Sequence, residues 1–439
     1  MLSPDISKEL EEGKWTRVHT YSFIAFAIGL FLEGYIFGIA SFATGWYSIP
    51  AIYRNLLLTW PYLWLIIGIA VGGPLSDKFG RKRTFIYSMA LNAIGGVLLA
   101  GSVNYVLVLT SLALLLFAAG SEMNVIMIMA HEIFPRKDRS KTMMILMDFV
   151  ALSSAILSAV GFISISSTVS FGRALAGSTI LLTIVILIYL RLHMPESIKW
   201  LEKTGKKERA INETNKYFSK VNSAVQITEQ SVQINKQSSQ IKNPPIWFKE
   251  VVATLVAFAD TTGFGLILIA LAPIYFPKLI SYIFLIAGVA GFGGGLLGFA
   301  GDKLSRKWLL TLSYVGITII MGITVVTLNI WKNNLILFWI LLIAFNAVGQ
   351  IAYMTEDTLK GELWPTRQRG SLTAIARVVS IGAFIPILFW VSTLPLSEYL
   401  AFGILVWAIG AAAAISWHIW GIETGKGVSI TTASGESST

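Results

Sequence analysis

A cluster of charge interrupts a long apolar run at Gly73-Pro74-Leu75-Ser76-Asp77-Lys78-Phe79-Gly80-Arg81-Lys82. A second copy stands at Gly298-Phe299-Ala300-Gly301-Asp302-Lys303-Leu304-Ser305-Arg306-Lys307, where the first glycine, the aspartate and the Arg-Lys pair recur in the same order. The two copies are separated by about half of the 439-residue chain. The recurrence predicts two related halves with the same order of elements.

Composition predicts that the chain lies in a membrane. Hydrophobic residues make up 55% of it and charged residues only 13%, and the mean hydropathy is +0.69, whereas soluble domains carry roughly 25% charged residues. The net charge of +10 then indicates basic loops at one membrane face and is no reason to propose a nucleic-acid partner. The absence of cysteine excludes disulfides, thiol catalysis and thiolate zinc sites. We predict no enzyme activity and no metal or cofactor, and no phosphate-binding loop for ATP occurs in the sequence.

The sequence contains twelve apolar runs of about 20 residues. Each run is long enough to cross a bilayer as a helix. They lie near 21–43, 56–75, 84–101, 106–134, 142–164, 174–192, 248–274, 280–300, 308–328, 335–363, 372–391 and 399–420. The Gly-rich eighth run is expected to pack closely against a neighbouring helix. The predicted fold is an all-α integral membrane protein with two pseudo-symmetric six-helix bundles.

A polar stretch separates the halves and sets the domain boundaries. We predict a first bundle over 1–194, a cytoplasmic central loop over 195–245, a second bundle over 246–421 and a disordered cytoplasmic tail over 422–439. Within the loop, 197–221 is compatible with helix, and 222–243 resembles a flexible linker because it is rich in Gln, Ser and Asn. Lys and Arg gather in 78–83, 136–141, 199–209, 303–307 and 360–369, so these connections and both termini are predicted to be cytoplasmic, in the plasma membrane.

The repeated motif Gly-x-x-x-Asp-Lys-x-Gly-Arg-Lys, placed after the second apolar run and echoed after the eighth, resembles the signature of the major facilitator superfamily. The sequence Pro195-Glu196-Ser197-Ile198-Lys199-Trp200-Leu201 is similar to the Pro-Glu-Ser-Pro-Arg-Trp-Leu element of sugar porters and organic ion transporters, with Ile198 and Lys199 as departures. The resemblance implies a transporter that binds a small-molecule substrate and protons, works by alternating access as a monomer, and draws energy from a proton gradient.

A second repeated pair predicts a cytoplasmic gate. Glu132 to Arg139 and Glu362 to Arg369 both read Glu-x-x-Pro-x-x-x-Arg, at matching places in the two halves, and proline ends each helix between an acid and a base. In the families that the sequence resembles, such charges pair and hold the halves together. The alternative is that they only fix topology. The residues assigned to the gate are Gly73, Asp77, Arg81, Glu132, Arg139, Glu196, Asp302, Arg306, Glu362 and Arg369.

Carboxylates deep in apolar runs are candidates for proton coupling, because an ionisable side chain at the bilayer centre is costly. Glu33 lies twelve residues into the first run, roughly 18 Å along a helix. Asp260 occupies the matching place in the second half. Glu122 in the fourth run and Asp148 in the fifth are further candidates. For each of them the alternative is a structural ion pair.

We expect Arg377 to be the one deep cation of the chain, and its planar fork of donors suits a carboxylate or phosphate. The competing interpretation is that Arg377 neutralises Glu356, Asp357 or Asp260. Further candidates for the substrate-binding lining are Tyr35, Asn124, Gln350 and Tyr353, although a lone amide or phenol on a membrane helix also suits a hydrogen bond between helices.

Sugar porters carry Gln-Gln-x-x-Gly-x-Asn in the seventh helix, where this chain has Ala259, Asp260 and Gly265. This departure disfavours a sugar, and Arg377 favours an organic anion such as a carboxylate. We therefore expect proton-coupled symport of a small organic solute, with an anion preferred. The alternatives are a transporter of sugar or another metabolite, an exchanger or efflux pump of the same fold, and a non-transporting nutrient sensor, for which the central loop of about 50 residues is short.

Overall fold

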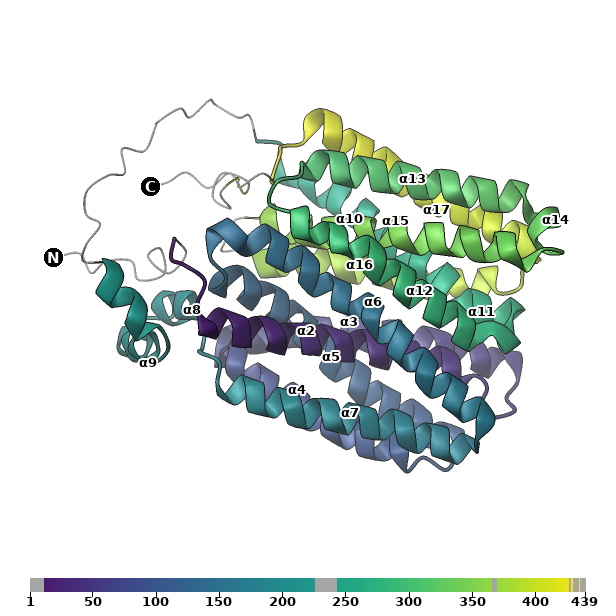
Figure 1. Cartoon of the computed structure of the whole chain (residues 1–439), viewed down its shortest axis with the longest axis horizontal. Coiled ribbons are helices and arrows are strands. Elements are labelled where there is room, and N and C mark those ends of the chain that lie inside the picture. Colours follow the sequence, from purple (N-terminus) through teal and green to yellow (C-terminus); the bar gives the residue numbers. More distant parts are fainter. Residues whose placement is uncertain (1–11, 226–242, 365–368, 426–427, 429–433, 435–439) are drawn as a thin grey trace.

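The structure is a computed structural model that describes residues 12–225, 243–364, 369–425, 428 and 434. In this part of the chain twelve helices are long and apolar enough to cross a membrane, which confirms the predicted number. The first six are α2 (Arg17–Ala43), α3 (Ala51–Phe79), α4 (Arg81–Ala100), α5 (Tyr105–Ile133), α6 (Arg136–Ser166) and α7 (Val169–Leu192). They form one bundle, drawn in purple to teal in Figure 1.

The second bundle is less regular. Its first span joins α10 (Ile246–Phe264), the π-helix η1 (Gly265–Ala270) and α11 (Leu271–Tyr275). Its second joins η2 (Pro277–Leu279), α12 (Ile280–Gly295) and η3 (Leu296–Ala300). The others are α13 (Arg306–Val326) with the short α14 (Leu328–Trp331), α15 (Leu335–Glu362), α16 (Arg369–Val391) and α17 (Leu396–Trp420).

The helix starts follow from local sequence. The side chains of Asn104, Thr168, Ser305 and Asn334 each accept a hydrogen bond from a backbone N–H in the first turn of the helix that follows, and these donors have no partner within the helix itself. Between α3 and α4 the chain turns at a single residue, Gly80, whose φ is 101°. Glycine adopts this conformation without the steric cost that a side chain brings.

Two short helices follow the sixth span, α8 (Ile198–Lys203) and α9 (Lys207–Val225), where a helix-compatible segment was predicted. Most of the predicted linker, 226–242, lies outside the described residues. Figure 1 shows α8 and α9 together at one end of the molecule. We call this end the basic end, because the Lys- and Arg-rich connections 78–83, 136–141, 199–209 and 303–307 meet there.

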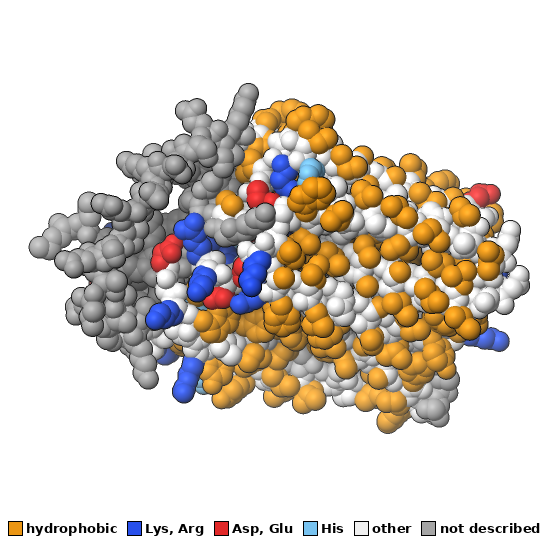
Figure 2. Space-filling model, turned by 45° about the horizontal axis from the view of Figure 1, so that its top comes forward, with side chains coloured by type: hydrophobic (Ala, Val, Ile, Leu, Met, Phe, Trp, Pro, Cys, Tyr) orange, Lys and Arg blue, Asp and Glu red, His pale blue; other side chains and the backbone are white. Residues whose placement is uncertain are grey.

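The outer surface separates apolar from charged side chains. In Figure 2 hydrophobic side chains cover the sides of the helices, and Lys, Arg, Asp and Glu gather near the basic end. Exposed apolar residues such as Leu182, Val289 and Val326 suit contact with lipid. The chain is therefore a multi-pass membrane protein.

The bundles meet along two pairs of helices, α6 with α12 and α3 with α16. Gly288 on α12 allows the first contact, since a Cβ there would lie 2.5 Å from the backbone nitrogen of Ala155 on α6. The close packing predicted for the Gly-rich run is thus confirmed. The space enclosed between the bundles forms the site described next.

Candidate functional site

A cavity of about 190 Å³ lies between the two bundles. Every span except α4, α7, α13 and α17 contributes to its lining. The polar or glycine positions in the lining are Glu33, Gly34, Gly38, Tyr62, Ser154, Asp260, Thr261, Gly265, Gly291, Asn346, Gln350 and Tyr353. Both halves therefore supply polar groups to one central space.

Two carboxylates face this cavity from opposite bundles, Glu33 on α2 and Asp260 on α10. Neither forms an ion pair among the described residues. Oε2 of Glu33 and Oδ1 of Asp260 are buried without a hydrogen-bond partner. An ionised carboxylate in this position would have no counter-charge or hydrogen bond to offset the cost of its burial. The geometry therefore suits groups that bind and release protons.

Neutral polar groups and aromatic rings make up much of the remaining lining. Gln350 donates a hydrogen bond to the carbonyl of Met147 across the bundle interface at 3.2 Å, and Asn346 and Tyr353 lie on the same helix, α15. The ring of Tyr62 packs edge-on against Phe37 with centroids 4.7 Å apart. The cavity thus offers amides, hydroxyls and aromatic faces.

Arg377 lies outside the central lining. It pairs with Asp357 at 2.6 Å, and Lys360 lies 2.9 Å from carboxylate oxygens of both Glu356 and Asp357. Arg377 lines a smaller void of about 20 Å³, together with Asn124 and His131. The structure therefore shows the arrangement that the sequence analysis kept as the competing interpretation of Arg377.

Glu122 lies inside the first bundle and not in the central lining. It forms an ion pair with Arg191 of α7 and accepts a hydrogen bond from Ser88 at 2.9 Å. The Arg191 guanidinium also lies 4.3 Å from the centre of the Phe85 ring. Tyr35 is fully buried outside both voids.

Arg191 and Lys360 are also buried cations, which the apolar pattern of the sequence did not predict. Arg191 stands near the end of its apolar run, shortly before Met194, where a long side chain usually reaches toward water. The signal that could have found it is the matching buried acid, Glu122, on another helix.

Asp148 lies at the contact between the bundles. Its carboxylate packs against Gly295 of α12, its Oδ1 has no hydrogen-bond partner, and its side chain forms no ion pair among the residues that the structure describes. The residue is 2% exposed, and it does not line the central cavity.

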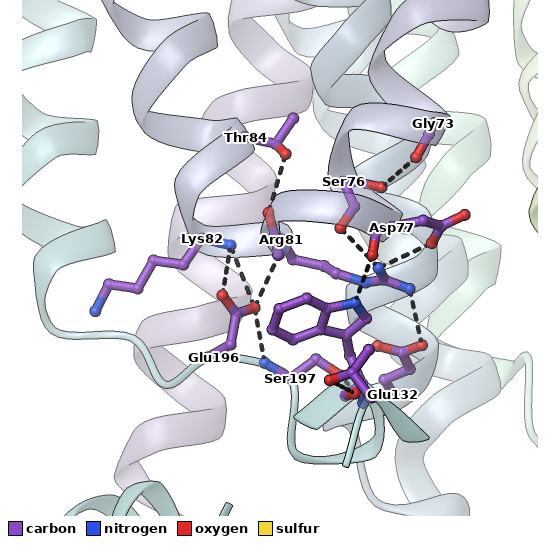
Figure 3. Close-up of polar contacts among 12 residues, drawn as sticks. Gly73, Ser76, Asp77, Arg81, Lys82, Thr84, Glu132, Glu196 and Ser197 are labelled. Carbon is purple, nitrogen blue, oxygen red and sulfur yellow. Dashed lines mark hydrogen bonds and ion pairs between the residues drawn. The ribbon is translucent and has the colours of Figure 1, made fainter. Parts of the chain in front are cut away.

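The first charge motif closes the basic end of the first bundle, as Figure 3 shows. Arg81 pairs with Asp77 at 2.9 Å and lies 3.7 Å from Glu132. Glu196 accepts hydrogen bonds from the backbone N–H groups of Arg81 and Lys82, at the start of α4. Burial raises the pKa of the Glu196 carboxyl above its ordinary value, and these N–H donors and the Arg81 charge offset only part of that rise.

Gly73 has no packing role in this structure. A Cβ at Gly73 would meet nothing within 4 Å, and the residue only accepts a hydrogen bond from Ser76. The close approach of α5 occurs one residue earlier, where Gly72 contacts Ser121.

The second motif links the two bundles. Arg306 donates to Glu362 at 3.3 Å and to Ser140 of the first bundle, and Asp302 accepts a hydrogen bond from the backbone N–H of Lys141 at 3.0 Å. Burial raises the pKa of the Asp302 carboxyl, and the Lys141 N–H and charge partly offset this effect. The gate residues of the second half thus lie at the interface between bundles.

Two gate candidates remain, Arg139 and Arg369. Arg139 donates to the carbonyl of Phe134 at the turn between α5 and α6. The side chain of Arg369 lies outside the described residues.

Glu423 is a site residue that the sequence analysis placed in a disordered tail. It accepts hydrogen bonds from the backbone N–H of Arg306 at 2.8 Å and from the hydroxyl of Ser305. It therefore caps α13 as Glu196 caps α4 in the first half. The signal was available, because Glu196-Ser197 and Glu423-Thr424 both follow the sixth span of their half.

The two bundles are also in contact at the opposite end of the molecule. Asn55 at the start of α3 donates to Ser392 after α16 at 2.8 Å, and Ser41 of α2 donates to the carbonyl of Ile269 at 2.9 Å. Hydrogen bonds therefore join the two bundles at both ends of the molecule.

The family model described as Major Facilitator Superfamily matches residues 19–387. The chain belongs to this superfamily. It is a transporter and not an enzyme, with the twelve-span, two-bundle fold. The glucose transporter GlcP of Staphylococcus epidermidis is 26% identical to this chain over 411 residues, which cover 84% of this chain and 86% of that protein. The arabinose-proton symporter of Bacillus subtilis is 26% identical over 234 residues, covering 49% and 48%.

Solved structures of the xylose transporter XylE from E. coli share the fold. The proton:xylose symporter XylE bound to 6-bromo-6-deoxy-D-glucose superposes with a TM-score of 0.74 at 19% identity, covering 93% of this chain and 97% of that one. These relatives belong to the sugar porter side of the predicted branch. The predicted preference for an organic anion has no support among them, and its structural premise fails because Arg377 does not reach the central lining.

Proposed function

We propose that the protein carries a small neutral polyhydroxylated solute, a monosaccharide or a polyol, together with protons by alternating access. The observation that carries this proposal is the charge of the cavity wall. Glu33 and Asp260 line it, and no Lys or Arg of the described ranges does. A carboxylate solute would meet acids without a neutralising cation, whereas a neutral solute would not.

The lining also suits the chemistry of sugars. Asn346 and Gln350 present amides that can donate to and accept from hydroxyl groups. Phe37, Tyr62 and Phe264 offer ring faces on which the C–H face of a sugar can pack. The sugar porter signature in the seventh helix is replaced by Asp260, so we propose that α15 supplies most of the hydrogen-bonding groups.

Glu33 is the proposed proton carrier of the first bundle. In the cycle, Glu33 takes up a proton while the cavity faces outward, and solute then binds to the uncharged site. The bundles rearrange, the gate contacts of Arg306 and Asp302 separate, and solute and proton leave on the other side. Proton coupling is supported by the similarity of the chain to an arabinose-proton symporter and to a proton:xylose symporter.

We further propose that the basic end is cytoplasmic, because Lys- and Arg-rich connections stay inside, and that the protein is a monomer of the plasma membrane. The proposed domains are 1–194, 195–245, 246–421 and 422–439. The tail assignment starts after Gly421, although Glu423 contacts α13.

The test is uptake into proteoliposomes with an imposed inward proton gradient. The panel is D-glucose, D-xylose, L-arabinose and myo-inositol, with lactate and benzoate as anions. We expect accumulation of at least one neutral solute, and a loss of gradient-driven accumulation of tenfold or more in Glu33→Gln. Glu398→Gln, in the first turn of α17 at the opposite end, is the matched control and should resemble wild type.

Each alternative predicts a different result. Accumulation of lactate or benzoate and of no neutral solute would reject the neutral-solute proposal. Counterflow of a sugar that ignores the proton gradient in both wild type and Glu33→Gln would indicate an exchanger and reject the role of Glu33.

A further inference from the structure

The membrane-embedded charges around the cavity do not balance. Four acids gather there, Glu33, Asp260, Glu356 and Asp357, against the two bases Lys360 and Arg377. The imidazole of His131 on α5 lines the small void beside Asp357 and Arg377. The five members in the second bundle are each at most 4% exposed. The buried pair inside the first bundle, Glu122 with Arg191, is balanced within itself.

The two bases are already engaged by two of the acids. Arg377 binds Asp357 at 2.6 Å, and Lys360 lies 2.9 Å from Glu356 and from Asp357. Asp260 receives no ion pair within the described part of the chain, and its Oδ1 has no hydrogen-bond partner. The cluster around Asp260 thus holds three acids for two bases, not counting Glu33.

Uncompensated charge is costly in a medium of low dielectric. The arrangement is therefore most stable when the cluster in the second bundle has bound one proton and Glu33 has bound another. We infer that the protein has a second proton-binding centre, Asp260 with the Glu356–Asp357–Lys360–Arg377 cluster, and that it moves two protons with each solute. This inference rests on the proposed function.

The neighbours of Asp260 support this assignment. The charges that act on it are those of Glu356, Lys360 and Asp357 of α15. Arg377 of α16 is engaged by Asp357, and α17 places its ionisable groups in the described part toward its ends, at Glu398, Tyr399 and His418. Phenols are the remaining ionisable groups near Asp260: Tyr62 of α3, Tyr314 of α13 and Tyr353 of α15.

The surroundings of Glu33 overlap in part with that centre, because the charges of Arg377 and Asp357 act on it. A small void beside Glu33 is also lined by Asn92 and Glu122, and Glu122 is held by Arg191 of α7. Asp148 on α6 packs against α12 and lies outside the cavity lining.

The proton steps balance without another reactant. On the outward side each centre forms one carboxyl O–H bond with a proton from solution. On the inward side each O–H bond breaks and the proton returns to solution. With a neutral solute, two positive charges cross the membrane in each cycle, and nothing is oxidised or reduced.

The experiment measures the coupling ratio in proteoliposomes, using D-glucose as the probe or, where the panel shows a better one, that sugar. The proton-motive force at which net sugar flux reverses is determined for a fixed sugar gradient. At a force of about 59 mV one coupled proton supports roughly tenfold accumulation and two support roughly a hundredfold. We expect the hundredfold value for wild type and the tenfold value for Asp260→Asn.

The results separate this inference from the proposed function. A ratio of one proton in wild type, unchanged in Asp260→Asn, overturns the second centre and leaves proton-coupled transport intact. A ratio of zero overturns both. Asp148→Asn is the matched control, because it removes a buried unpaired acid outside the cavity; a drop from two to one in this variant would move the second proton to Asp148 and reject the Asp260 centre.

If Asp260→Asn folds but does not transport, a second measurement tests the inference. Infrared spectra of purified protein report protonated carboxyl groups by their C=O stretch. Asp260→Asn should remove one protonated-carboxyl band at neutral pH, and Glu33→Gln should remove a different one. An unchanged band pattern in Asp260→Asn would show that the second bundle holds no such proton.

Discussion

The ion pair between Glu122 and Arg191 places two opposite charges among apolar helices, with residue exposures of 3% and 2%. Ser88 donates to the carboxylate, and the Phe85 ring covers the guanidinium. A buried pair of this kind does not by itself make a fold more stable than apolar residues would, but removal of one partner leaves a charge without compensation.

We therefore predict that Arg191→Met destabilises the protein by about 3 to 5 kcal/mol. The double variant Glu122→Gln/Arg191→Met removes both charges and should recover most of that loss. Thermal unfolding in detergent, followed by near-UV circular dichroism, measures both. Equal destabilisation in the single and double variants would show that the buried charge of Glu122 is stable without the charge of Arg191.

At the scale of elements, two helices of the second bundle depart from regular α-geometry beside the cavity. The seventh span contains the π-helix η1, and the eighth ends in the 3₁₀ segment η3. Gly265, the first residue of η1, lines the cavity, and Gly295, next to η3, packs against Asp148 at the interface between the bundles. Such irregular turns are common at functional sites, and the apolar pattern alone did not predict them.

Helix α12 provides a matched pair of glycines for a packing test. A Cβ at Gly288 would lie 2.5 Å from the Ala155 nitrogen and 2.9 Å from the Ala151 carbonyl oxygen, whereas a Cβ at Gly293 would meet nothing within 4 Å. We predict that Gly288→Val costs about 1 to 3 kcal/mol and slows sugar uptake, because it separates α12 from α6. Gly293→Val should match wild type in both thermal unfolding and uptake. Similar effects of the two substitutions would refute this account of the interface.

At the scale of the whole molecule, hydrogen bonds join the bundles at both ends of the cavity. Asn55 and Ser392 close the end opposite the basic end, and Asp302 with Lys141 closes the basic end. Alternating access requires that these two sets of contacts break in turn.

The chain contains no cysteine, which allows a direct test. In Asn55→Cys/Ser392→Cys we predict that oxidant forms a disulfide across the bundles and stops sugar uptake, and that reductant restores it. Each single variant should transport under oxidant as wild type does. Undiminished uptake by the crosslinked protein would mean that this end does not open during transport.

The two-bundle fold was predictable from local features. A bilayer requires runs of about 20 apolar residues, so the twelve spans could be counted along the sequence. The repeated motifs at Gly73 and Gly298 indicated two halves, and the same residues indicated the superfamily to which the chain belongs. The pseudo-symmetric pair Glu33 and Asp260 was also predictable, because an acid within an apolar run stands out wherever it occurs.

What only the tertiary structure decided is which charges find partners. Arg377 and Glu122 had been given roles from their positions along the chain, and Glu423 had been assigned to a disordered tail. The structure pairs them with Asp357, Arg191 and the start of α13. Whether an ionisable group faces a cavity or a counter-ion depends on helices that are far apart in sequence. Partner distances of a few ångströms therefore determine the chemistry of each charge, and no pattern along a single helix contains them.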